Sequence, residues 1–179
     1  SKPSSTSLFS PLDIRGTRFR NRIVISPMCT YSAHDGMASD WHLVHLGKFA
    51  LGGAGAVFTE AAAVEPRGRI THGDLGIWSA EHAAVLKPVT SFLRRNGALP
   101  AIQIAHAGRK ASCAVAWEGG GPLPDDEAWE IIAPSAIPFS ADSQTPRKMD
   151  RADMDRLLKA FGQGARWAEE AGFDMIVLH

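Results

Sequence analysis

Short apolar runs alternate with amphipathic segments along this sequence, and this alternation constrains the fold more than any other feature. The four apolar runs are bounded by Gly, Pro or polar residues, which is typical of buried strands. The segments between them carry apolar residues at helical spacing. A strict β-α-β-α-β-α-β order predicts a parallel sheet with right-handed crossovers, and the continuous apolarity indicates strands covered on both faces. The predicted strands are residues 23–26, 56–59, 101–104 and 175–178.

Capping residues delimit the first and third helices. The first helix is predicted to start at Ser39 or Asp40 and to end at residue 51, before a pair of glycines. The third is predicted to start at Asp150 or Asp153 and to end at a glycine that precedes the last strand. The buried stripe of this third helix is predicted to comprise Leu157, Leu158, Phe161, Ala165 and Ala168.

Glycine and proline place the remaining breaks. Residues 9–19 are short and rich in turn signals, and they predict a small hairpin with Gly16 at its turn. Ser79 is predicted to cap only a short helical turn. Pro88 is predicted to begin a separate helix, because proline suits the first helical position better than a helix interior.

Polar side chains follow the strands at the points where the strands end. The carboxyl ends of parallel strands meet at one rim, and barrels of this kind place their chemistry there. Donors and acceptors gathered on such a rim favour a planar, polar ligand lying across it. The residues concerned are Cys29 and Tyr31 after the first strand, Thr59, Glu60 and Ala61 in the second, Gln103, His106, Arg109 and Lys110 in or after the third, and His179 after the fourth.

Five ordered motifs carry a family resemblance that covers essentially all of the chain after residue 7. They closely resemble the Old Yellow Enzyme family, and the Cys29/Tyr31 pair resembles its bacterial xenobiotic-reductase, thermophilic-like ene-reductase subgroup. The motifs are Asn-Arg-Ile-Val-Ile-Ser-Pro-Met-Cys-Thr-Tyr at 21–31, Glu-Ala-Ala-Ala-Val-Glu-Pro-Arg-Gly-Arg-Ile at 60–70, Gly-Ile-Trp-Ser at 76–79, Gln-Ile-Ala-His-Ala-Gly-Arg-Lys at 103–110 and Gly-Phe-Asp-Met-Ile-Val-Leu-His at 172–179.

The resemblance implies an FMN-dependent ene-reductase on a TIM (β/α)8 barrel. Such an enzyme takes a hydride from NADPH or NADH onto flavin N5 and passes it to the β-carbon of an activated alkene, such as an enone or enal. Hydride addition builds negative charge on the carbonyl oxygen, so hydrogen-bond donors placed there stabilise the transition state.

The resemblance also implies roles for single residues. Backbone groups of Ser26, Pro27, Met28 and Cys29 line the flavin, Ala61 contacts it, and Gln103 reaches its pyrimidine edge. Cys29 adjusts the flavin potential, while Tyr31 and His179 hold the substrate carbonyl oxygen. The proton donor of the family lies beyond residue 179.

A full barrel needs eight strands, and the four predicted here supply its N-terminal half. Residues 8–179 are therefore expected to form half of a single barrel domain, with residues 1–7 as a loose tail. Half a barrel exposes two sheet edges and a large apolar face. We expect a C-terminal half with strands five to eight, on a separate or cleaved polypeptide, to complete it and to hold the FMN phosphate. The family often forms dimers, so a homo-oligomer is a further expectation.

Composition excludes several other classes of protein. Among 179 residues, 19 are Lys or Arg and 19 are Asp or Glu, so no net charge favours nucleic acid or an anionic membrane. No apolar run approaches the ~20 residues that span a bilayer. Residues 1–7 are polar, unlike a secretory signal. Two cysteines, Cys29 and Cys113, make no disulfide framework, which indicates a reducing cytoplasm.

Three alternatives stay open on the sequence. His42 and His45 have the spacing of a metal pair on a helix, but no third ligand accompanies them. Another FMN barrel, such as a dienoyl-CoA reductase or an amine dehydrogenase relative, needs clustered cysteines for an iron–sulfur cluster; the two here do not suffice, but the C-terminal half could supply them. A non-catalytic half-barrel without a cofactor is the third alternative.

Overall fold

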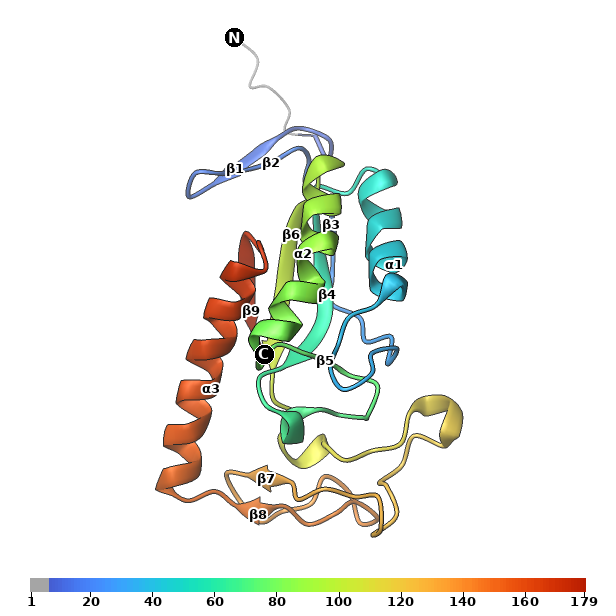
Figure 1. Cartoon of the computed structure of the whole chain (residues 1–179), viewed down its shortest axis with the longest axis vertical. Helices are drawn as coiled ribbons and strands as arrows, with labels where there is room; N and C mark the ends of the chain where they lie inside the picture. Colours follow the sequence, from blue (N-terminus) through green and yellow to red (C-terminus); the bar gives the residue numbers. More distant parts are fainter. Residues whose placement is uncertain (1–6) are drawn as a thin grey trace.

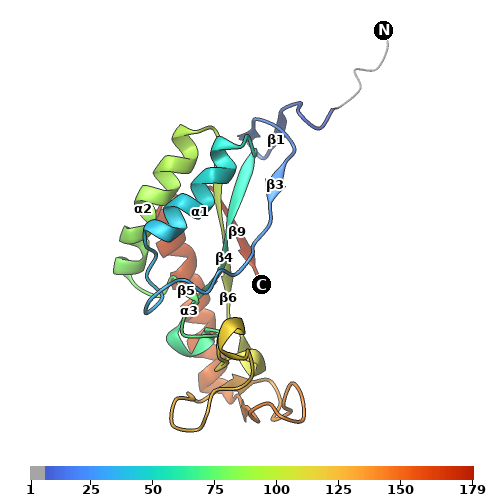
Figure 2. The ribbon, with the colours of Figure 1, turned by 90° about the vertical axis from the view of Figure 1, so that its right-hand side faces the viewer.

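A parallel sheet with helices on one face forms the body of the molecule (Figures 1 and 2). The computed structural model describes residues 7–179, so most of the predicted tail at 1–7 lies outside the described residues. The sheet order is β3 (Val24–Ile25), β4 (Ala56–Ala63), β6 (Leu99–Ala105) and β9 (Met175–Leu178), all parallel, and β5 (Leu75–Gly76) pairs with the end of β4. The alternating order predicted from sequence is confirmed, with a shorter first strand and longer second and third strands.

The register between strands sorts side chains onto two faces. Ala62, Ile102 and Ile104 are fully buried and pack against the helices, in a cluster that includes Leu75 and Leu86. Neighbouring residues on each strand point the other way, because side chains alternate along a strand. Figure 2 shows no helix on that second face. One face of the sheet is therefore a core and the other is open, which differs from the two covered faces predicted from sequence.

A bulge interrupts β4 at the point where this alternation matters most. Phe58 pairs with Ala101 and Ala61 pairs with Gln103, so β4 has one more residue than β6 between these two pairs. An extra residue of this kind changes the direction in which a side chain points, and such bulges are common next to functional sites. Here both Thr59 and Glu60 lie opposite the single residue Ile102, and both are buried.

The three helices are α1 (Asp40–Leu51), α2 (Ala80–Arg95) and α3 (Arg151–Glu170). Ser39 is the N-cap of α1, and Gly53 adopts a left-handed φ of +101° just after its end. This agrees with the predicted boundaries, since glycine alone adopts that conformation at little cost.

The prediction that Pro88 begins a separate helix is wrong, because α2 is continuous and Pro88 lies inside it. Proline removes the one hydrogen bond to the carbonyl four residues earlier, here that of Ala84. Both Pro88 and Ala84 are exposed, so the missing hydrogen bond lies at the solvent-facing side of the helix. Burial of the opposite face of α2, including Leu86 and Leu93, outweighs the remaining cost.

Helix α3 begins as predicted and buries less than predicted. Asp150 is its N-cap and accepts a 2.8 Å hydrogen bond from the backbone N–H of Asp153, whose carboxylate in turn accepts from the Asp150 N–H at 3.1 Å. Ala168 is fully buried, as predicted. Leu158 is 75% exposed, so its prediction as a core residue is wrong: it lies on a face of α3 that no described element covers.

A hairpin of β1 (Leu12–Ile14) and β2 (Thr17–Phe19) precedes the sheet, as predicted. Its turn residues Arg15 and Gly16 both have positive φ, which matches the twist of a two-residue hairpin. The long segment between β6 and α3 carries three-residue 3₁₀ turns at Gly108–Lys110 and Ala116–Glu118, and a small parallel pair of β7 (Ile132–Ala133) with β8 (Arg147–Lys148). Figure 1 shows this pair below the carboxyl edge of the sheet.

Another 3₁₀ turn, Pro66–Gly68, follows β4. Within residues 7–179, none of the helices combines the length and the apolar character needed to cross a bilayer.

Arg20 joins the ends of two helices. Its guanidinium donates to the carbonyl oxygens of Ala50 (2.7 Å) and Ala54 (2.8 and 3.0 Å) around the end of α1, and to that of Asn96 (2.8 Å) after α2. The carbonyls of Ala54 and Asn96 lie just past the helix ends, and that of Ala50 also accepts from the Gly53 N–H at 3.1 Å. We expect Arg20→Met to lower the free energy of unfolding by about 2–4 kcal/mol, since it removes the donor that these three carbonyls share.

Urea unfolding measures the effect, and Arg18→Met is the matched control. Arg18 pairs with Asp13 on the surface, where both side chains are at least 60% exposed. The control is expected to change stability by less than about 1 kcal/mol. Equal effects of the two substitutions would contradict the role of Arg20.

Candidate functional site

The rim predicted from sequence exists on the open face of the sheet. The backbone N–H of His179 donates to the carbonyl oxygen of Ile104 at 3.0 Å, which sets His179 beside the end of β6. Gln103 pairs in register with Ala61 on one side and with Val177 on the other. A hollow of about 130 Å³ opens at this edge. It is lined by Ala61, Ala63, Gly68, Ile70, Asp74, Ala105, His106, Ala107, Lys110 and His179.

Cys29 lies at the same edge of the sheet, in the segment that follows β3. Its thiol has a hydrogen bond with the Ala61 backbone and another with Tyr31. Burial raises the pKa of the Cys29 thiol to about 11, the Asp74 and Glu60 charges add to the rise, and the two hydrogen bonds only partly oppose it. The structure thus brings Cys29, Ala61, Gln103 and His179 together at one edge.

Tyr31 is held in an unusual backbone conformation. Its φ is +50°, in the left-handed region that side chains rarely adopt. Gly73 packs so tightly against the Tyr31 backbone that no β-carbon fits there, and the Ala33 N–H donates to the Gly73 carbonyl at 2.9 Å. Burial raises the pKa of the Tyr31 hydroxyl, and Cys29, Asp74 and Glu60 raise it further. At neutral pH Tyr31 is therefore a neutral hydrogen-bond donor.

The remaining predicted residues lie at the margins of the site. Ser26, Pro27 and Met28 follow β3 along the sheet edge and do not line the hollow; Met28 is 50% exposed. Arg109 and Lys110 are exposed, with their cationic groups 5.8 Å and 4.4 Å from the centre of the Phe139 ring. Lys110 also lines the hollow and Arg109 does not, so only Lys110 of these two residues lies at the site.

His106 is held by its neighbours on both ring nitrogens. Its Nδ1 accepts from the Gly108 N–H at 3.0 Å, so its Nε2 carries the proton and donates to Glu65 at 3.1 Å. With both nitrogens engaged, His106 serves as a wall of the hollow. This geometry favours a structural role for His106.

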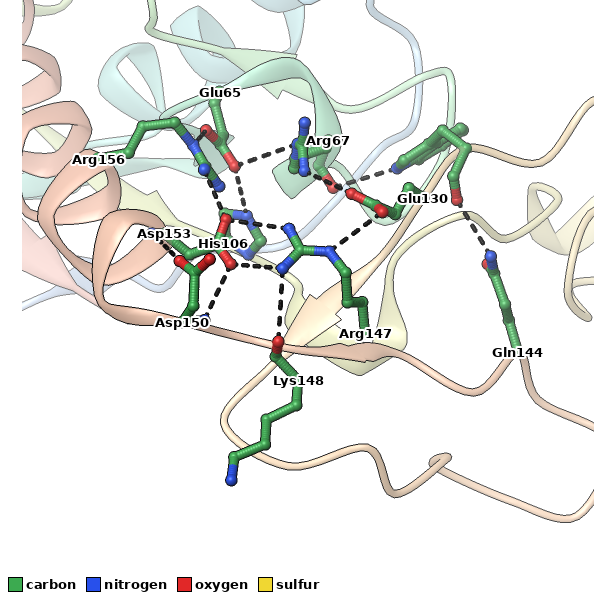
Figure 3. Close-up of polar contacts among 11 residues, drawn as sticks. Glu65, Arg67, His106, Glu130, Gln144, Arg147, Lys148, Asp150, Asp153 and Arg156 are labelled. Carbon is green, nitrogen blue, oxygen red and sulfur yellow. Dashed lines mark hydrogen bonds and ion pairs between the residues drawn. The ribbon is translucent and has the colours of Figure 1, made fainter.

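A network of ion pairs extends from Glu65 to the long segment and α3 (Figure 3). Arg156 bridges Glu65 at 3.1 Å and Asp153 at 2.7 Å. Arg147 bridges the same Asp153 at 2.6 Å and Glu130 at 3.1 Å. Sequence reasoning missed this network, because its members are far apart in the chain and each resembles an ordinary surface charge.

The metal alternative on α1 finds no support. His42 is buried and bonds to Glu60 at 3.0 Å, while His45 stacks on Trp41 with ring centres 5.9 Å apart. Across residues 7–179, no group of three or more His, Cys, Asp or Glu side chains is placed to hold a metal ion.

Gln103 presents a partly exposed amide at this edge. It lies on the open face, is only partly buried, and its amide has no hydrogen-bond partner among residues 7–179. An amide both donates and accepts, which suits the mixed edge of a flavin ring. The half-buried thiol of Cys29 and the donors Tyr31 and His179 complete a surface suited to such a polar, planar group.

The network of Figure 3 predicts acid sensitivity. Burial tends to raise the pKa of Glu65, but hydrogen bonds from His106 and Arg156 outweigh it and hold that pKa below its ordinary 4.5. A carboxyl group with a lowered folded-state pKa stabilises the protein above its unfolded-state pKa, and this stability is lost as pH falls through the folded value. The thermal midpoint of the wild type should therefore fall as pH drops below about 4.5.

Glu65→Gln should be less stable than the wild type at pH 7 and should lose part of this pH dependence. Thermal melts between pH 7 and pH 3 measure both effects. Glu118→Gln, on the exposed 3₁₀ turn at Ala116–Glu118, is the control. An unchanged pH dependence in Glu65→Gln would contradict the role given to Glu65.

Comparisons with known proteins agree with this geometry. Residues 7–179 match the model of the NADH:flavin oxidoreductase / NADH oxidase family. An NADPH dehydrogenase of Geobacillus sp. is 48% identical over 176 residues, covering 97% of this chain and 48% of the relative. One of Geobacillus thermodenitrificans is 44% identical over 177 residues, covering 98% and 48%. The chain thus spans about half the length of the curated relatives it matches.

The similar solved structures include morphinone reductase. It superposes with a TM-score of 0.84 at 25% identity, covering 100% of this chain and 49% of that one. A morphinone reductase variant in complex with tetrahydroNAD gives a TM-score of 0.80 at 26% identity, covering 96% and 48%. The open sheet is therefore the first half of an Old Yellow Enzyme-type barrel. The chain belongs to the NADH:flavin oxidoreductase / NADH oxidase family.

Proposed function

We propose that this chain is the N-terminal half of an FMN-dependent ene-reductase, which moves a hydride from NADPH or NADH to the β-carbon of an activated alkene. The observation that carries the proposal is the edge shared by Cys29, Ala61, Gln103 and His179 on the open face of the sheet. Family membership and relatives named NADPH dehydrogenase support the hydride donor. The solved morphinone reductase complex with tetrahydroNAD supports a nicotinamide partner.

The residues of this chain would hold FMN by their backbone and by one amide. Backbone groups of Ser26, Pro27, Met28 and Cys29 would line it, Ala61 would contact it, and the free amide of Gln103 would meet its pyrimidine edge. FMN, when bound, supplies the hydride-accepting and hydride-donating chemistry. The neutral Cys29 thiol adds a soft, polarizable contact without adding charge.

Tyr31 and His179 would orient the alkene substrate. Negative charge builds on its carbonyl oxygen as the hydride arrives, and a phenol and an imidazole are donors suited to that charge. Because its pKa is raised, the Tyr31 hydroxyl keeps its proton at neutral pH. A donor that holds its proton stabilises the developing oxyanion more than the neutral substrate, which lowers the barrier.

We also propose that residues 8–179 form half of one barrel domain, completed by a C-terminal half that supplies strands five to eight. Support comes from the open sheet edges, where Val24 is 47% and Leu178 is 71% exposed. Apolar residues exposed along sheet edges favour pairing with another segment. A dimer of completed barrels and a cytoplasmic location, which keeps the free thiols Cys29 and Cys113 reduced, belong to the same proposal.

The test is to co-express the chain with a C-terminal half from a relative and to measure bound flavin and NADPH-dependent reduction of 2-cyclohexenone. Tyr31→Phe and His179→Ala should each lower turnover by about 10²-fold, since each removes a donor to the oxyanion. His34→Ala, at a side chain that is 97% exposed, is the matched histidine control and should leave turnover unchanged.

Three other outcomes would each contradict a different part of the proposal. An assembled barrel that binds no flavin would contradict the proposed function and favour a non-catalytic half-barrel. Bound flavin with full activity in both variants would contradict the roles given to Tyr31 and His179. Flavin bound by this chain alone, at one per chain, would contradict the need for a second half.

A further inference from the structure

A buried carboxylate lies directly behind the segment that carries Cys29 and Tyr31. Glu60 is 5% exposed, and the bulge in β4 sets it beside Thr59 opposite a single residue of β6. Its partner on α1 is His42, which is 2% exposed and lies 3.0 Å from the carboxylate. The function proposed above assigns no role to either residue.

The protonation of His42 follows from its second hydrogen bond. The Ser39 backbone N–H donates to His42 Nδ1 at 3.0 Å, so Nδ1 carries no proton and Nε2 donates to Glu60. His42 is therefore a neutral donor, and within residues 7–179 Glu60 pairs with no Lys or Arg side chain. The Glu60 carboxylate is therefore held by hydrogen bonds from His42 and Thr30 alone.

Thr30 connects this carboxylate to the site. Its backbone N–H and its hydroxyl both donate to Glu60, the hydroxyl at 3.1 Å to each oxygen. The same hydroxyl accepts from Trp41 Nε1 at 3.1 Å. Thr30 is the single residue between Cys29 and Tyr31, so these contacts fix the backbone from which both side chains extend.

We propose that Glu60, oriented by His42, is a positioning residue that fixes the backbone between Cys29 and Tyr31 and places a buried negative charge beside both side chains. Like charges disfavour ionisation of a neighbouring acid. The Glu60 charge accordingly contributes, after burial and Asp74, to the raised pKa of Cys29, about 11. It also contributes to the raised pKa of Tyr31.

The groups around Cys29 come from four directions. Tyr31 belongs to its own segment, Glu60 comes from β4, and Asp74 comes from the loop before β5, where Ile70 and Thr71 donate to its carboxylate. Lys110 and His179 line the hollow from the β6 and β9 side. The nearest charged groups that act on the thiol are thus both negative.

This inference rests on the proposed function for its catalytic meaning. A thiol and a phenol that keep their protons add no negative charge where hydride transfer builds one, so they do not oppose that step. The state of the thiol is measurable without flavin, however. Failure of the test below therefore differs from failure of the proposed function.

The test follows alkylation of Cys29 by iodoacetamide against pH, with peptide mass spectrometry to separate Cys29 from Cys113. Only the thiolate reacts, so the midpoint of the rate profile reports the thiol pKa. Glu60→Gln should lower this midpoint by about 0.5–1 pH unit, since it removes one buried negative charge. Glu130→Gln, a carboxylate of the network in Figure 3 that does not act on Cys29, should leave the midpoint unchanged.

A second variant separates the effect of the Thr30 contact from the effect of the Glu60 charge. Its result does not depend on whether Glu60→Gln folds. Thr30→Val keeps the shape and the Glu60 charge but removes the hydroxyl that links the two. Its midpoint should stay near that of the wild type, while its limiting alkylation rate should rise by about threefold or more as the segment loosens. An unchanged midpoint in folded Glu60→Gln, or an unchanged limiting rate in Thr30→Val, would overturn the proposal.

Discussion

The hydrogen-bonded register between β4 and β6 determines where every important side chain points. Up to Phe58 the two strands pair residue for residue, and after the bulge they pair again from Ala61 and Gln103. The register sends Ala62, Ile102 and Ile104 to the helices and leaves Ala61 and Gln103 on the open face. A slip of one residue would reverse both faces, so burial of the core and assembly of the rim depend on the same pairing.

The bulge gives this register a second consequence. It places Glu60 on the helix-covered side of the sheet, where the carboxylate reaches Thr30 and His42 rather than solvent. A different network, through Glu65, supports the opposite wall of the hollow and holds His106. One network contains a carboxylate with neutral partners, and the other pairs its carboxylates with arginines. The side near Cys29 is therefore negative, whereas the side near His106 is balanced in charge.

The sequence predicts the layout of this molecule well, because strand ends and helix caps are local signals. Ser39 and Asp150 cap their helices as predicted, and the rim residues follow strands that pair in the expected order. Pro88 was predicted wrongly because the penalty of one lost hydrogen bond is local, whereas the burial that outweighs it is tertiary. Leu158 has the spacing of a core residue, yet exposure depends on which neighbours are present.

The polar support of the site could not be predicted from sequence for a related reason. The sequence places Glu60 in a strand at the rim, but its partner His42 lies on a helix 18 residues earlier, and only the bulge directs the two together. Glu65 and Arg156 are separated by 91 residues. Pairings of this kind are set by the final packing of elements, and no short-range pattern reports them.

The central claim is that the open rim receives FMN through the unpartnered amide of Gln103, and an affinity measurement tests it most directly. FMN fluorescence quenching, followed in the assembled barrel, gives the dissociation constant for the wild type, for Gln103→Leu and for Gln163→Leu on the outer side of α3. The account predicts that Gln103→Leu binds FMN at least about tenfold more weakly, a loss of about 1.4 kcal/mol, while Gln163→Leu binds like the wild type. Equal affinity in all three proteins would contradict it.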